Sequence, residues 1–432
     1  MKKYLKFLQK SLSTLFLIVC FSLEGATVIH AGTLLDGTGS EPTREMSIVI
    51  DNQVITRVET GYIELEPDDT YLDLTGYFIL PGLIDMHVHL SSEYSSKSYE
   101  ESISLNSSDY AIKAVANARK TLLAGFTSVR NLGDSGNVTI SLRNAISKGI
   151  VPGPRIFSSG KTISSSGGHG DPTNSLRSDL SSDPGPAQGV INNSSDSFKA
   201  VRYRYKENAD LIKITATGGV LSNAKNGQNP QMTSEEISSI VLAARDYGFK
   251  VAAHAHGAEG IKRAVIAGVD SIEHGTLMDS EGMKLMREKG TYYVPTLLAG
   301  AWVADKAKVD GFFPNLVRPK ALEIGPQLKT TFAKAYQAGV KIAFGTDTGV
   351  SSHGKNAEEF YEMVDAGMPE IQAILSATKE ASILLGQNSM LGSITVGKYA
   401  DIIAVSGNPL ENIRILETVD FVMKAGNIYK LP

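Results

Sequence analysis

The sequence predicts an α/β protein: a (β/α)8 TIM barrel with a small β-sandwich domain formed by the two ends of the chain. From about residue 78, short β-rich segments alternate with helical stretches, and eight such β segments can be counted. The flanks instead read as short strands separated by Gly and Asn turns. Eight alternating units favour a closed parallel barrel. The alternative is an open doubly wound sheet, which the lack of a Gly-rich phosphate-binding fingerprint after the first strand disfavours.

The first segment, residues 1–26, has the character of a secretory signal. Basic "MKKYLKFLQK" precedes the apolar run "SLSTLFLIVCFSL", which is shorter than the roughly 20 residues that span a bilayer. We expect cleavage near Ala26, export to the periplasm or medium, and no stable membrane span afterwards. An uncleaved anchor and lipidation at Cys20 are the alternatives. Cys20 is the only cysteine, so the mature chain would contain neither disulfides nor thiolate ligands.

The mature chain divides into three expected parts. Residues 27–77 and 392–432 form the two halves of the β-sandwich, and residues 78–391 form the barrel. The eight barrel strands read "YFILPGLIDMHVHL", "FTSVRNLG", "RIFSSGKTIS", "LIKITAT", "KVAAHAH", "SIEHG", "YYVPTLL" and "KIAFGTD". Among the helices, "TSEEISSIVLAARDYGF" opens with a capping box of Thr233 and Glu236. Residues 164–198, rich in Ser, Gly, Asp and Asn, are expected to form a long loop.

Composition sets broad limits on the partners. The 432 residues are 42% hydrophobic and 20% charged, which is ordinary for a soluble globular protein. The formal net charge is -4 and there is no long basic run. Nucleic acid is therefore not expected as a partner, because binding phosphates needs a concentrated positive patch.

Histidines are concentrated at the ends of the expected strands. Side chains alternate between the two faces of a strand. One face of "LIDMHVHL" therefore carries Leu83, Asp85, His87 and His89, and the other carries Ile84, Met86, Val88 and Leu90. The apolar face packs under helices, which leaves the two imidazoles pointing inward where one cation can bind both. Barrel active sites lie at this C-terminal end of the strands.

Four other strands repeat this arrangement. The same alternation places inward the side chains of Lys213, His254, His256, His274 and Asp347. Taken singly, each has a structural explanation: a hydrogen-bonded histidine, a lysine paired with a buried carboxylate, or a helix-capping aspartate. A buried lysine needs a partner or must lose its proton. Because these His, Lys and Asp side chains all point inward from the ends of five strands, together they predict a metal site.

The motifs resemble those of the amidohydrolase superfamily, in particular its two-metal members. The matching pieces are "PGLIDMHVH", "LIKI", "HAH", "EHG" and "GTD", with "GSITVGKYADIIAVSGNP" near the C-terminus. Within the superfamily, "SSSGGHGDPTN", "ITATGGVLS" and "VAAHAHGAEGIKRA" are most similar to the Xaa-Pro dipeptidase (prolidase) and Xaa-Arg/Lys carboxypeptidase group. The likeness covers nearly the whole mature chain.

The resemblance implies two divalent metal ions, most often Zn2+. The first would be bound by His87, His89 and Asp347. The second would be bound by His254 and His274, and a carboxylated Lys213 would bridge both. Strand geometry alone does not distinguish His254 from His256 as the ligand, because both face inward; the family pattern favours His254.

The same resemblance suggests roles in hydrolysis. A metal-bridging hydroxide would attack the scissile carbonyl, with Asp347 moving the proton and His256 stabilising the oxyanion or orienting the substrate. His169 would help to hold the substrate's carboxylate. His353 is a further candidate for the pocket wall, or a solvated loop residue. Some relatives place a Tyr near position 232, where this chain has Met232.

The expected activity is that of a dipeptidase for Xaa-Pro or hydrophobic C-terminal dipeptides. The alternatives are an Xaa-Arg/Lys carboxypeptidase and an N-acyl amino acid amidohydrolase of the ochratoxin-cleaving type. A cyclic-amidine hydrolase would lack the bridging Lys213, and a non-catalytic barrel scaffold would have lost ligand positions that are filled here. Relatives of this kind are often homo-oligomers, so self-association is expected.

Overall fold

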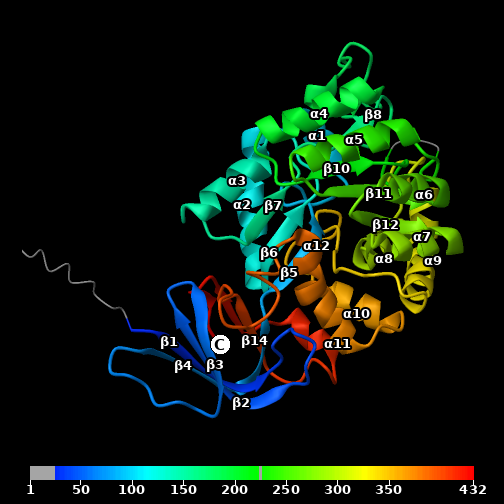
Figure 1. Cartoon of the computed structure of the whole chain (residues 1–432). Coiled ribbons are helices and arrows are strands. Elements are labelled where there is room, and N and C mark those ends of the chain that lie inside the picture. Colours follow the sequence, from blue (N-terminus) through cyan, green and yellow to red (C-terminus); the bar gives the residue numbers. More distant parts are fainter. Residues whose placement is uncertain (1–24, 223–225) are drawn as a thin grey trace, which may run out of the picture.

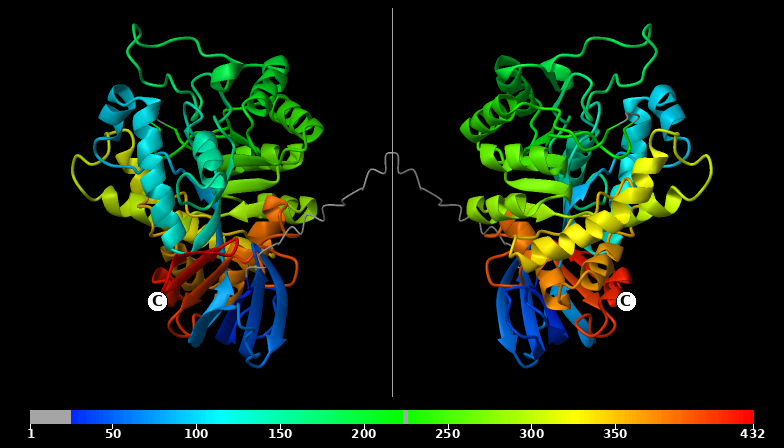
Figure 2. Two further views of the ribbon diagram at one scale, coloured as in Figure 1. Left: turned by 90° about the vertical axis from the view of Figure 1, so that its left-hand side faces the viewer. Right: turned by 90° about the vertical axis from the view of Figure 1, so that its right-hand side faces the viewer.

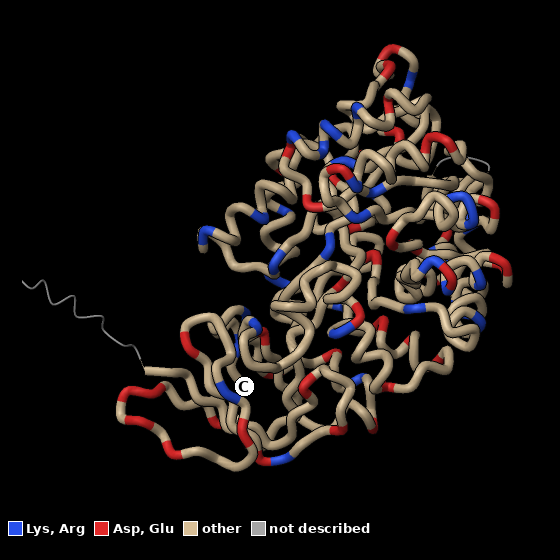
Figure 3. The backbone as a smooth tube through the Cα atoms, in the orientation of Figure 1, with Lys and Arg blue, Asp and Glu red and all other residues tan. Residues whose placement is uncertain are grey.

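The computed structural model describes residues 25–222 and 226–432. The predicted signal at residues 1–26 lies outside the described residues except for its last two positions, and so does Cys20. Within the described part, no helix combines the length and the apolar character needed to cross a bilayer. Lys and Arg are interspersed with Asp and Glu along the chain (Figure 3).

Strands from both ends of the chain form one mixed sheet, at one end of the molecule (Figures 1 and 2). In spatial order its strands are β16 (Asn427–Lys430), β15 (Phe421–Lys424), β14 (Ile402–Val405), β4 (Thr70–Pro81), β1 (Thr27–Leu34), β2 (Thr43–Asp51) and β3 (Val54–Thr60). β1 and β4 are parallel, and the other neighbours are antiparallel. The sequence predicted a sandwich from these segments, whereas the hydrogen bonds join them into a single sheet of seven strands.

The remaining strands are parallel and lie among the helices. One sheet contains β5 (Leu83–Val88), β6 (Phe126–Asn131) and β7 (Arg155–Ser158). A second contains β10 (Ile212–Thr215), β11 (Val251–Gly257), β12 (Ser271–Leu277) and β13 (Tyr292–Val294). A short pair, β8 (Ser164–Ser165) and β9 (Val190–Ile191), lies in the segment predicted as a long loop. The α/β class predicted from the sequence is therefore confirmed.

Isolated parallel bridges connect the two parallel sheets. Ile163 pairs with Ile214, which links the β7 side to β10. Tyr293 of β13 pairs with Ile342, and Thr348 pairs with Val88 of β5. The predicted eighth strand, residues 341–347, together with the adjoining Thr348, thus contacts the neighbours expected of it, but through single bridges instead of a continuous ladder.

Helices surround the parallel strands (Figure 1). They are α1 (Ser98–Ser104), α2 (Ser107–Leu123), α3 (Val138–Ser147), α4 (Ser194–Lys206), α5 (Ser234–Asp246), α6 (Ala258–Ala267), α7 (Ser280–Lys289), α8 (Leu297–Lys306), α9 (Arg318–Gln337), α10 (Glu358–Asp365), α11 (Glu370–Leu375) and α12 (Ala381–Leu385). The predicted capping box at the start of α5 is confirmed. Thr233 Oγ1 accepts from the Glu236 backbone N–H, and Glu236 accepts from that of Thr233.

The predicted first barrel strand is two strands in the structure. β4 ends at Pro81 and pairs with β14, whereas β5 starts at Leu83 and pairs with β6. Gly82 lies between them, and a Cβ there would meet Thr127 Oγ1 at 2.3 Å. The absence of a side chain at Gly82 therefore lets the chain pass tightly from one sheet to the other, where β5 carries His87 into the site.

Candidate metal centre

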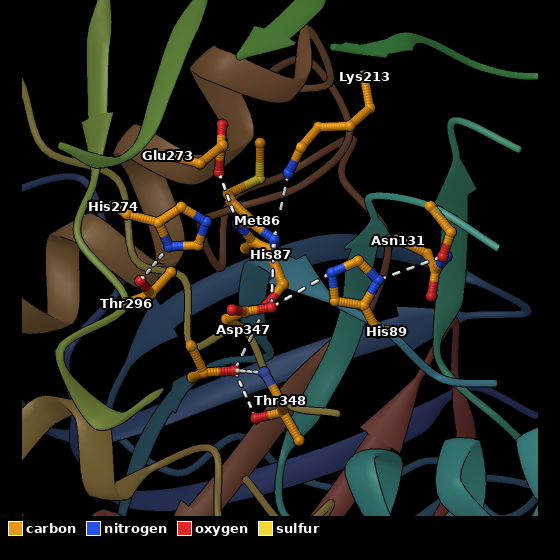
Figure 4. A network of polar contacts seen from close by, with 12 residues as sticks. Met86, His87, His89, Asn131, Lys213, Glu273, His274, Thr296, Asp347 and Thr348 are labelled. Carbon is orange, nitrogen blue, oxygen red and sulfur yellow. Dashed lines mark hydrogen bonds and ion pairs between the residues drawn. The ribbon is translucent and has the colours of Figure 1, made fainter. Parts of the chain in front are cut away.

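Eight of the nine predicted site residues line one cavity: His87, His89, His169, Lys213, His254, His256, His274 and Asp347. They come from β5, β10, β11 and β12, from the segments that follow β5 and β8, and from the segment that precedes α10. Figure 4 shows His87 between Lys213, Glu273 and Asp347. The parallel strands thus bring together residues separated by up to 260 positions in the sequence.

The tightest group is His87, His89 and Asp347. Asp347 Oδ1 lies 3.4 Å from His87 Nε2 and 3.2 Å from His89 Nε2. One ligand atom from each of the three residues lies within 4.8 Å of the others, so these residues could hold a metal ion. Two imidazoles and a carboxylate are a donor set that Zn2+ and similar divalent ions accept.

Each of these two imidazoles is oriented by a partner outside the group. His87 Nδ1 lies 2.9 Å from Glu273 Oε2, and His89 Nδ1 lies 3.2 Å from the Gly133 carbonyl. A carboxylate and a carbonyl can only accept, so both Nδ1 atoms carry the proton. The Nε2 lone pairs therefore face Asp347, as metal-ligating histidines require.

His254 and His274, on the neighbouring strands, also have one ring nitrogen bonded to a protein group. His254 Nε2 donates to the Gly218 carbonyl at 3.1 Å, which leaves Nδ1 unprotonated in the neutral ring. His274 Nδ1 lies 2.8 Å from Thr296 Oγ1. Their ring centroids are 4.7 Å apart. Two further imidazoles thus have one nitrogen fixed by protein groups and a second one unused.

Burial keeps these imidazoles neutral. Burial, followed by the charge of Lys213, lowers the pKa of His87 to about 4 against the opposing effect of Asp347. Burial, followed by the neighbouring histidines, holds the pKa of His254 and of His274 well below the usual value. Near pH 7 all three rings therefore offer a lone pair, so the residues present fit a site for divalent cations.

Lys213 lies inside this ring of donors. Its Nζ is 3.4 Å from His87 Nε2, and the residue is 4% exposed. Burial lowers the pKa of Lys213 to about 8, although Glu273 and Asp347 favour the charged form. The amine is therefore much closer to losing its proton near neutral pH than an exposed lysine.

Two histidines line the cavity beside these donors. His256 Nδ1 lies 2.8 Å from Thr276 Oγ1, and burial lowers the pKa of His256 to about 3. His169 is hydrogen-bonded through Nδ1 to Ser222 Oγ, and its ring centroid lies 4.3 Å from that of His254. Burial lowers the pKa of His169 to about 4. Both rings reach the cavity in neutral form.

His353 is placed elsewhere. Its Nε2 donates to the Ser92 carbonyl at 2.9 Å, and its Nδ1 lies 3.4 Å from Thr121 Oγ1. The residue is 5% exposed and does not line the cavity. The structure therefore places His353 neither in the pocket wall nor on a solvated loop, the two positions expected from the sequence. Both ring nitrogens are used in tying the segment before α10 to the segments around β5 and α2.

Sequence reasoning missed Glu273 and Arg130. Arg130 of β6 is 2% exposed and donates to Glu273 Oε1 at 2.8 Å, to the Met86 carbonyl at 2.6 Å and to Ser271 Oγ at 3.0 Å. Burial alone would raise the pKa of Glu273, but Arg130 and His87 outweigh it and lower the pKa to about 2. Glu273 is thus an anion under the site. The signal in the sequence was a charged residue inside each of two apolar strands, "TSVRN" and "SIEHG".

Strand alternation failed for Glu273 because of the backbone at His274. His274 has φ 69° and Asp347 has φ 56°, both in the left-handed region that non-Gly residues rarely adopt. The change of φ at His274 lets two consecutive side chains, those of Glu273 and His274, reach the site. Such positions are typical of sites where the surrounding structure holds a strained backbone.

Apolar side chains form much of the cavity wall, and its volume is about 260 Å³. The apolar part comprises Tyr94, Leu132, Val220, Leu221, Ala299, Val303, Ile324, Leu328 and Val350. Asp347 is the only carboxylate among the described residues that line it. The cavity therefore combines a few polar groups with a largely apolar wall, as small-molecule sites commonly do.

Comparison with known proteins agrees with this geometry. Residues 78–431 match the amidohydrolase family. Ochratoxinase from Aspergillus niger is 31% identical over 436 aligned residues, which cover 94% of this chain and 87% of that protein. A crystal structure of a Xaa-Pro dipeptidase with methionine bound in its active site is 55% identical, with a TM-score of 0.92, and covers 94% of this chain and 100% of that chain.

A prolidase crystallised with N-methylphosphonate-L-proline is 32% identical, with a TM-score of 0.86 and the same coverage of 94% and 100%. The resemblance read from the sequence motifs is thus confirmed over nearly the whole described chain, and with it hydrolysis of amide or peptide bonds as the activity. The chain belongs to the amidohydrolase family.

Proposed function

We propose that the protein is a binuclear, metal-dependent dipeptidase that cleaves Xaa-Pro or other dipeptides with an apolar C-terminal residue. The observation that carries the proposal is the convergence of neutral imidazole nitrogens, Asp347 and a deprotonation-prone Lys213 on one cavity. His87, His89 and Asp347 would hold one ion, and His254 and His274 the other. Zn2+ suits this nitrogen and oxygen donor set.

Lys213 is proposed to be carboxylated and to bridge the two ions. A lowered pKa supports this, because only the neutral amine adds to CO2. The resulting carbamate is an anion, so the site exchanges a buried positive charge for a negative one that two cations compensate. Carboxylation would therefore remove the free-energy cost of burying a charged lysine whose Nζ lies 3.4 Å from His87 Nε2.

Bound divalent ions would supply hydroxide near neutral pH by lowering the pKa of a shared water. The chain's own residues position and protonate the reactants. Asp347 is ionised, since the histidines and Lys213 outweigh its burial and lower its pKa to about 2. Its carboxylate is proposed to accept the proton of the attacking water and to deliver it to the leaving nitrogen. Nε2 of His256 is proposed to stabilise the oxyanion or orient the substrate.

The cavity supports an apolar substrate. Among its described lining residues only Asp347 is acidic, and it belongs to the reaction centre. A Lys or Arg side chain of a substrate would therefore find no second carboxylate, which disfavours the Xaa-Arg/Lys carboxypeptidase alternative. The structural neighbours described as a Xaa-Pro dipeptidase with bound methionine and as a prolidase with a proline phosphonate support the same substrate class.

The second candidate is an N-acyl amino acid amidohydrolase. Its support is the Aspergillus niger ochratoxinase, which aligns over nearly the whole chain. Both candidates use the same carbonyl chemistry and differ in the group on the acyl side. We propose His169, beside Ser222, as the group that helps to hold the substrate's carboxylate in either case.

Three expectations remain part of the proposal. The parallel bridges at Ile163, Ile342 and Thr348 support one closed (β/α)8 barrel over residues 78–391, with residues 27–77 and 392–432 as the accompanying β domain. The basic and apolar segment at residues 1–26 supports export to the periplasm or medium. Self-association into a homo-oligomer is also proposed.

The deciding experiment is a substrate panel on the zinc-loaded protein. It compares Xaa-Pro dipeptides, Xaa-Arg and Xaa-Lys dipeptides, and N-acyl phenylalanines such as ochratoxin A. We expect the highest kcat/KM for an Xaa-Pro or apolar dipeptide. Preference for basic C-terminal residues would overturn the assignment of substrate, and no hydrolysis of any member by protein with full metal content would favour a non-catalytic scaffold.

A further inference from the structure

Asp85 carries a buried carboxylate that has no role in the reaction proposed above. It belongs to β5, two residues before His87, and it is fully buried without lining the cavity. Its hydrogen-bond partners in the described part of the chain are all neutral groups. A buried carboxylate without a cation is costly unless hydrogen bonds compensate it, so these partners need an explanation.

Four hydrogen bonds occupy both oxygens of this carboxylate. Oδ1 accepts from the backbone N–H of His87 at 3.0 Å and from that of Thr346 at 3.1 Å. Oδ2 accepts from Thr346 Oγ1 at 2.7 Å and from Asn356 Nδ2 at 2.8 Å. An ionised carboxylate suits such a set, because it has about four acceptor positions and no donor. Asp85 thus joins β5 to both ends of the segment 346–356.

The segment 346–356 contributes Asp347, Gly349 and Val350 to the lining of the cavity. Thr346 Oγ1 donates to Asp85, so it can only accept from its other partners. These are the backbone N–H of Thr348, at 2.9 Å, and the hydroxyl of Thr348. The residues on both sides of Asp347 are therefore fixed, one directly by Asp85 and the other through Thr346.

These fixed neighbours hold Asp347 in an unusual backbone conformation. Its φ is 56°, in the left-handed region, and its N–H donates to the His87 carbonyl at 2.7 Å. A non-Gly residue keeps such a conformation only where the surrounding structure holds it. The carboxylate of Asp347 then points toward His87 and His89, with Oδ1 3.2 Å from His89 Nε2 (Figure 4).

We propose that Asp85 is a positioning residue, which holds Asp347 through Thr346 and Asn356 in the conformation that proton transfer requires. The inference rests on the proposed dipeptidase function and identifies what places its proton carrier. Asp85 does not line the cavity, so its loss should slow the chemical step and leave substrate affinity nearly unchanged. A residue that only stabilised the fold would change neither kcat nor KM of the folded enzyme.

The first test compares kcat and KM of wild type and Asp85→Asn on Xaa-Pro dipeptides. The amide keeps the shape of the carboxylate but turns an N–H toward Asn356 Nδ2, so two donors meet. We expect kcat to fall about 10- to 100-fold, as for a reacting group displaced by about 1 Å, with KM within about twofold of wild type. Wild-type kcat in Asp85→Asn would overturn the proposal.

The matched control is Asp401→Asn. Asp401 is also a buried aspartate, but it lies directly before β14, outside the cavity. It accepts from Arg155 Nη1 and from the Ala425 N–H, both at 2.8 Å. We expect Asp401→Asn to lower the free energy of unfolding and to leave kcat unchanged. An equal loss of kcat in both variants would show a general effect of buried aspartates and would overturn the proposal.

Thr346 and Asn356 provide variants that keep Asp85 testable if Asp85→Asn fails to fold. Thr346→Val removes the hydroxyl with little change of shape, and Thr346→Ser keeps it. We expect a difference in kcat of at least about tenfold between the two, which corresponds to one hydrogen bond to a charged group. The exchange Asp85→Asn, Asn356→Asp returns a carboxylate to the same hydrogen bond and should restore part of kcat. Equal kcat in Thr346→Val and Thr346→Ser would overturn the proposal.

The second test needs no hydrolysis. In a crystal structure of metal-free Asp85→Asn we expect Asp347 to leave the left-handed region and its Oδ1 to lose contact with His89 Nε2. Zinc affinity, measured by competition with a chelator, should fall at least about tenfold, as when the support of a metal ligand is lost. Asp347 unmoved in that structure, with wild-type zinc affinity, would contradict the positioning role.

The two tests separate the two hypotheses. If wild type cleaves no dipeptide but Asp347 moves in Asp85→Asn, the proposed function fails and the positioning of Asp347 by Asp85 stands. If dipeptides are cleaved equally fast by wild type and Asp85→Asn, the function stands and the positioning role fails.

Discussion

The Nδ1 atom of His87 lies 2.9 Å from the carboxylate of Glu273, and the same carboxylate accepts a hydrogen bond from Arg130 at 2.8 Å. These contacts lie beneath the proposed metal ligands and fix which nitrogen of His87 faces them. They also show that the ligand set depends on buried charges that do not line the cavity themselves.

We expect Glu273→Gln to lower metal affinity about 10- to 100-fold, because a neutral amide no longer makes His87 as strong a ligand. The measurement is zinc competition with a chelator of known affinity. Glu59→Gln, an exposed change in β3, is the matched control. Affinity within twofold of wild type would contradict the role assigned to Glu273.

The stability of the same variant gives a second check. Removing one partner of a buried ion pair costs about 3–5 kcal/mol, because Arg130 stays buried without its anion. The double variant Arg130→Met, Glu273→Gln should recover part of this loss while metal affinity remains low. The free energies of unfolding of wild type, Arg130→Met, Glu273→Gln and the double variant form a double-mutant cycle. This cycle measures the coupling energy between Arg130 and Glu273.

Lys213→Ala should lose both activity and metal. A two-ion site that loses its bridging anion should retain about one ion per chain or fewer, as measured by elemental analysis, and kcat should fall by at least about 100-fold. Short-chain carboxylates such as propionate should restore part of the activity by supplying an anion in the vacated space. Lys250→Ala, in a half-buried ion pair away from the cavity, is the control. Full metal content and full activity in Lys213→Ala would end the bridging hypothesis.

Asp347→Asn should lower kcat about 100- to 10,000-fold, the range expected for loss of a positioned proton carrier. Its far-UV circular dichroism should match that of wild type, because the amide has nearly the same shape as the carboxylate. Asp305→Asn, on an exposed part of α8, controls for the change of net charge. Retention of more than a tenth of kcat would exclude Asp347 as the proton carrier.

Substitutions of His169 and of His353 should have different effects. His169→Asn should raise KM about 10- to 100-fold with a smaller effect on kcat, since a hydrogen bond to a charged group contributes about 1.5–3 kcal/mol. His353→Asn should instead leave KM unchanged and lower the free energy of unfolding, because it disrupts the bond to the Ser92 carbonyl. Steady-state kinetics and denaturant unfolding of both variants provide the comparison, and equal effects on KM would contradict it.

Because of Lys424, the free energy of unfolding should depend on pH in the alkaline range. Burial, aided by Arg155, lowers the pKa of Lys424 to about 8, whereas an unfolded lysine titrates near 10.5. Between these values the unfolded chain binds more protons, so the free energy of unfolding rises with pH. Below about pH 8 the folded protein carries the full free-energy cost of a buried, charged Lys424. Above about pH 10.5 the amine is neutral in both the folded and the unfolded chain, so this cost is absent.

We therefore expect wild type to gain up to about 3 kcal/mol relative to Lys424→Met between pH 7 and pH 10.5. The quantity to measure is the difference between the two proteins in unfolding free energy, which cancels groups that titrate alike in both. A difference that stays constant, or that falls as pH rises, would show that Lys424 is charged in the folded state throughout this range.

Alternation along strands predicted much of the site because it depends only on local geometry. His87 and His89 face one interior, as do His254 and His256, since β5 and β11 have a period of two. It failed at Glu273, where the left-handed φ of the next residue, His274, turned two consecutive side chains inward. A backbone conformation of this kind depends on tertiary packing and leaves no mark in the hydrophobic pattern.

Long-range packing explains the other differences. The split at Gly82 follows from the approach of Thr127, which lies 45 positions later in the sequence. His353 has a structural role because its Nε2 donates to the Ser92 carbonyl. The local sequence around either residue does not indicate this long-range hydrogen bond.

The seven-stranded sheet has a consequence for synthesis. β14 lies between β4 and β15, with Ile402 paired to Pro81. On a ribosome adding about 5–20 residues per second, the β4 edge waits for some tens of seconds until its neighbour emerges. Throughout that interval an unpaired strand edge is open to other nascent chains, so a chaperone that covers β4 during translation should improve the yield of native protein.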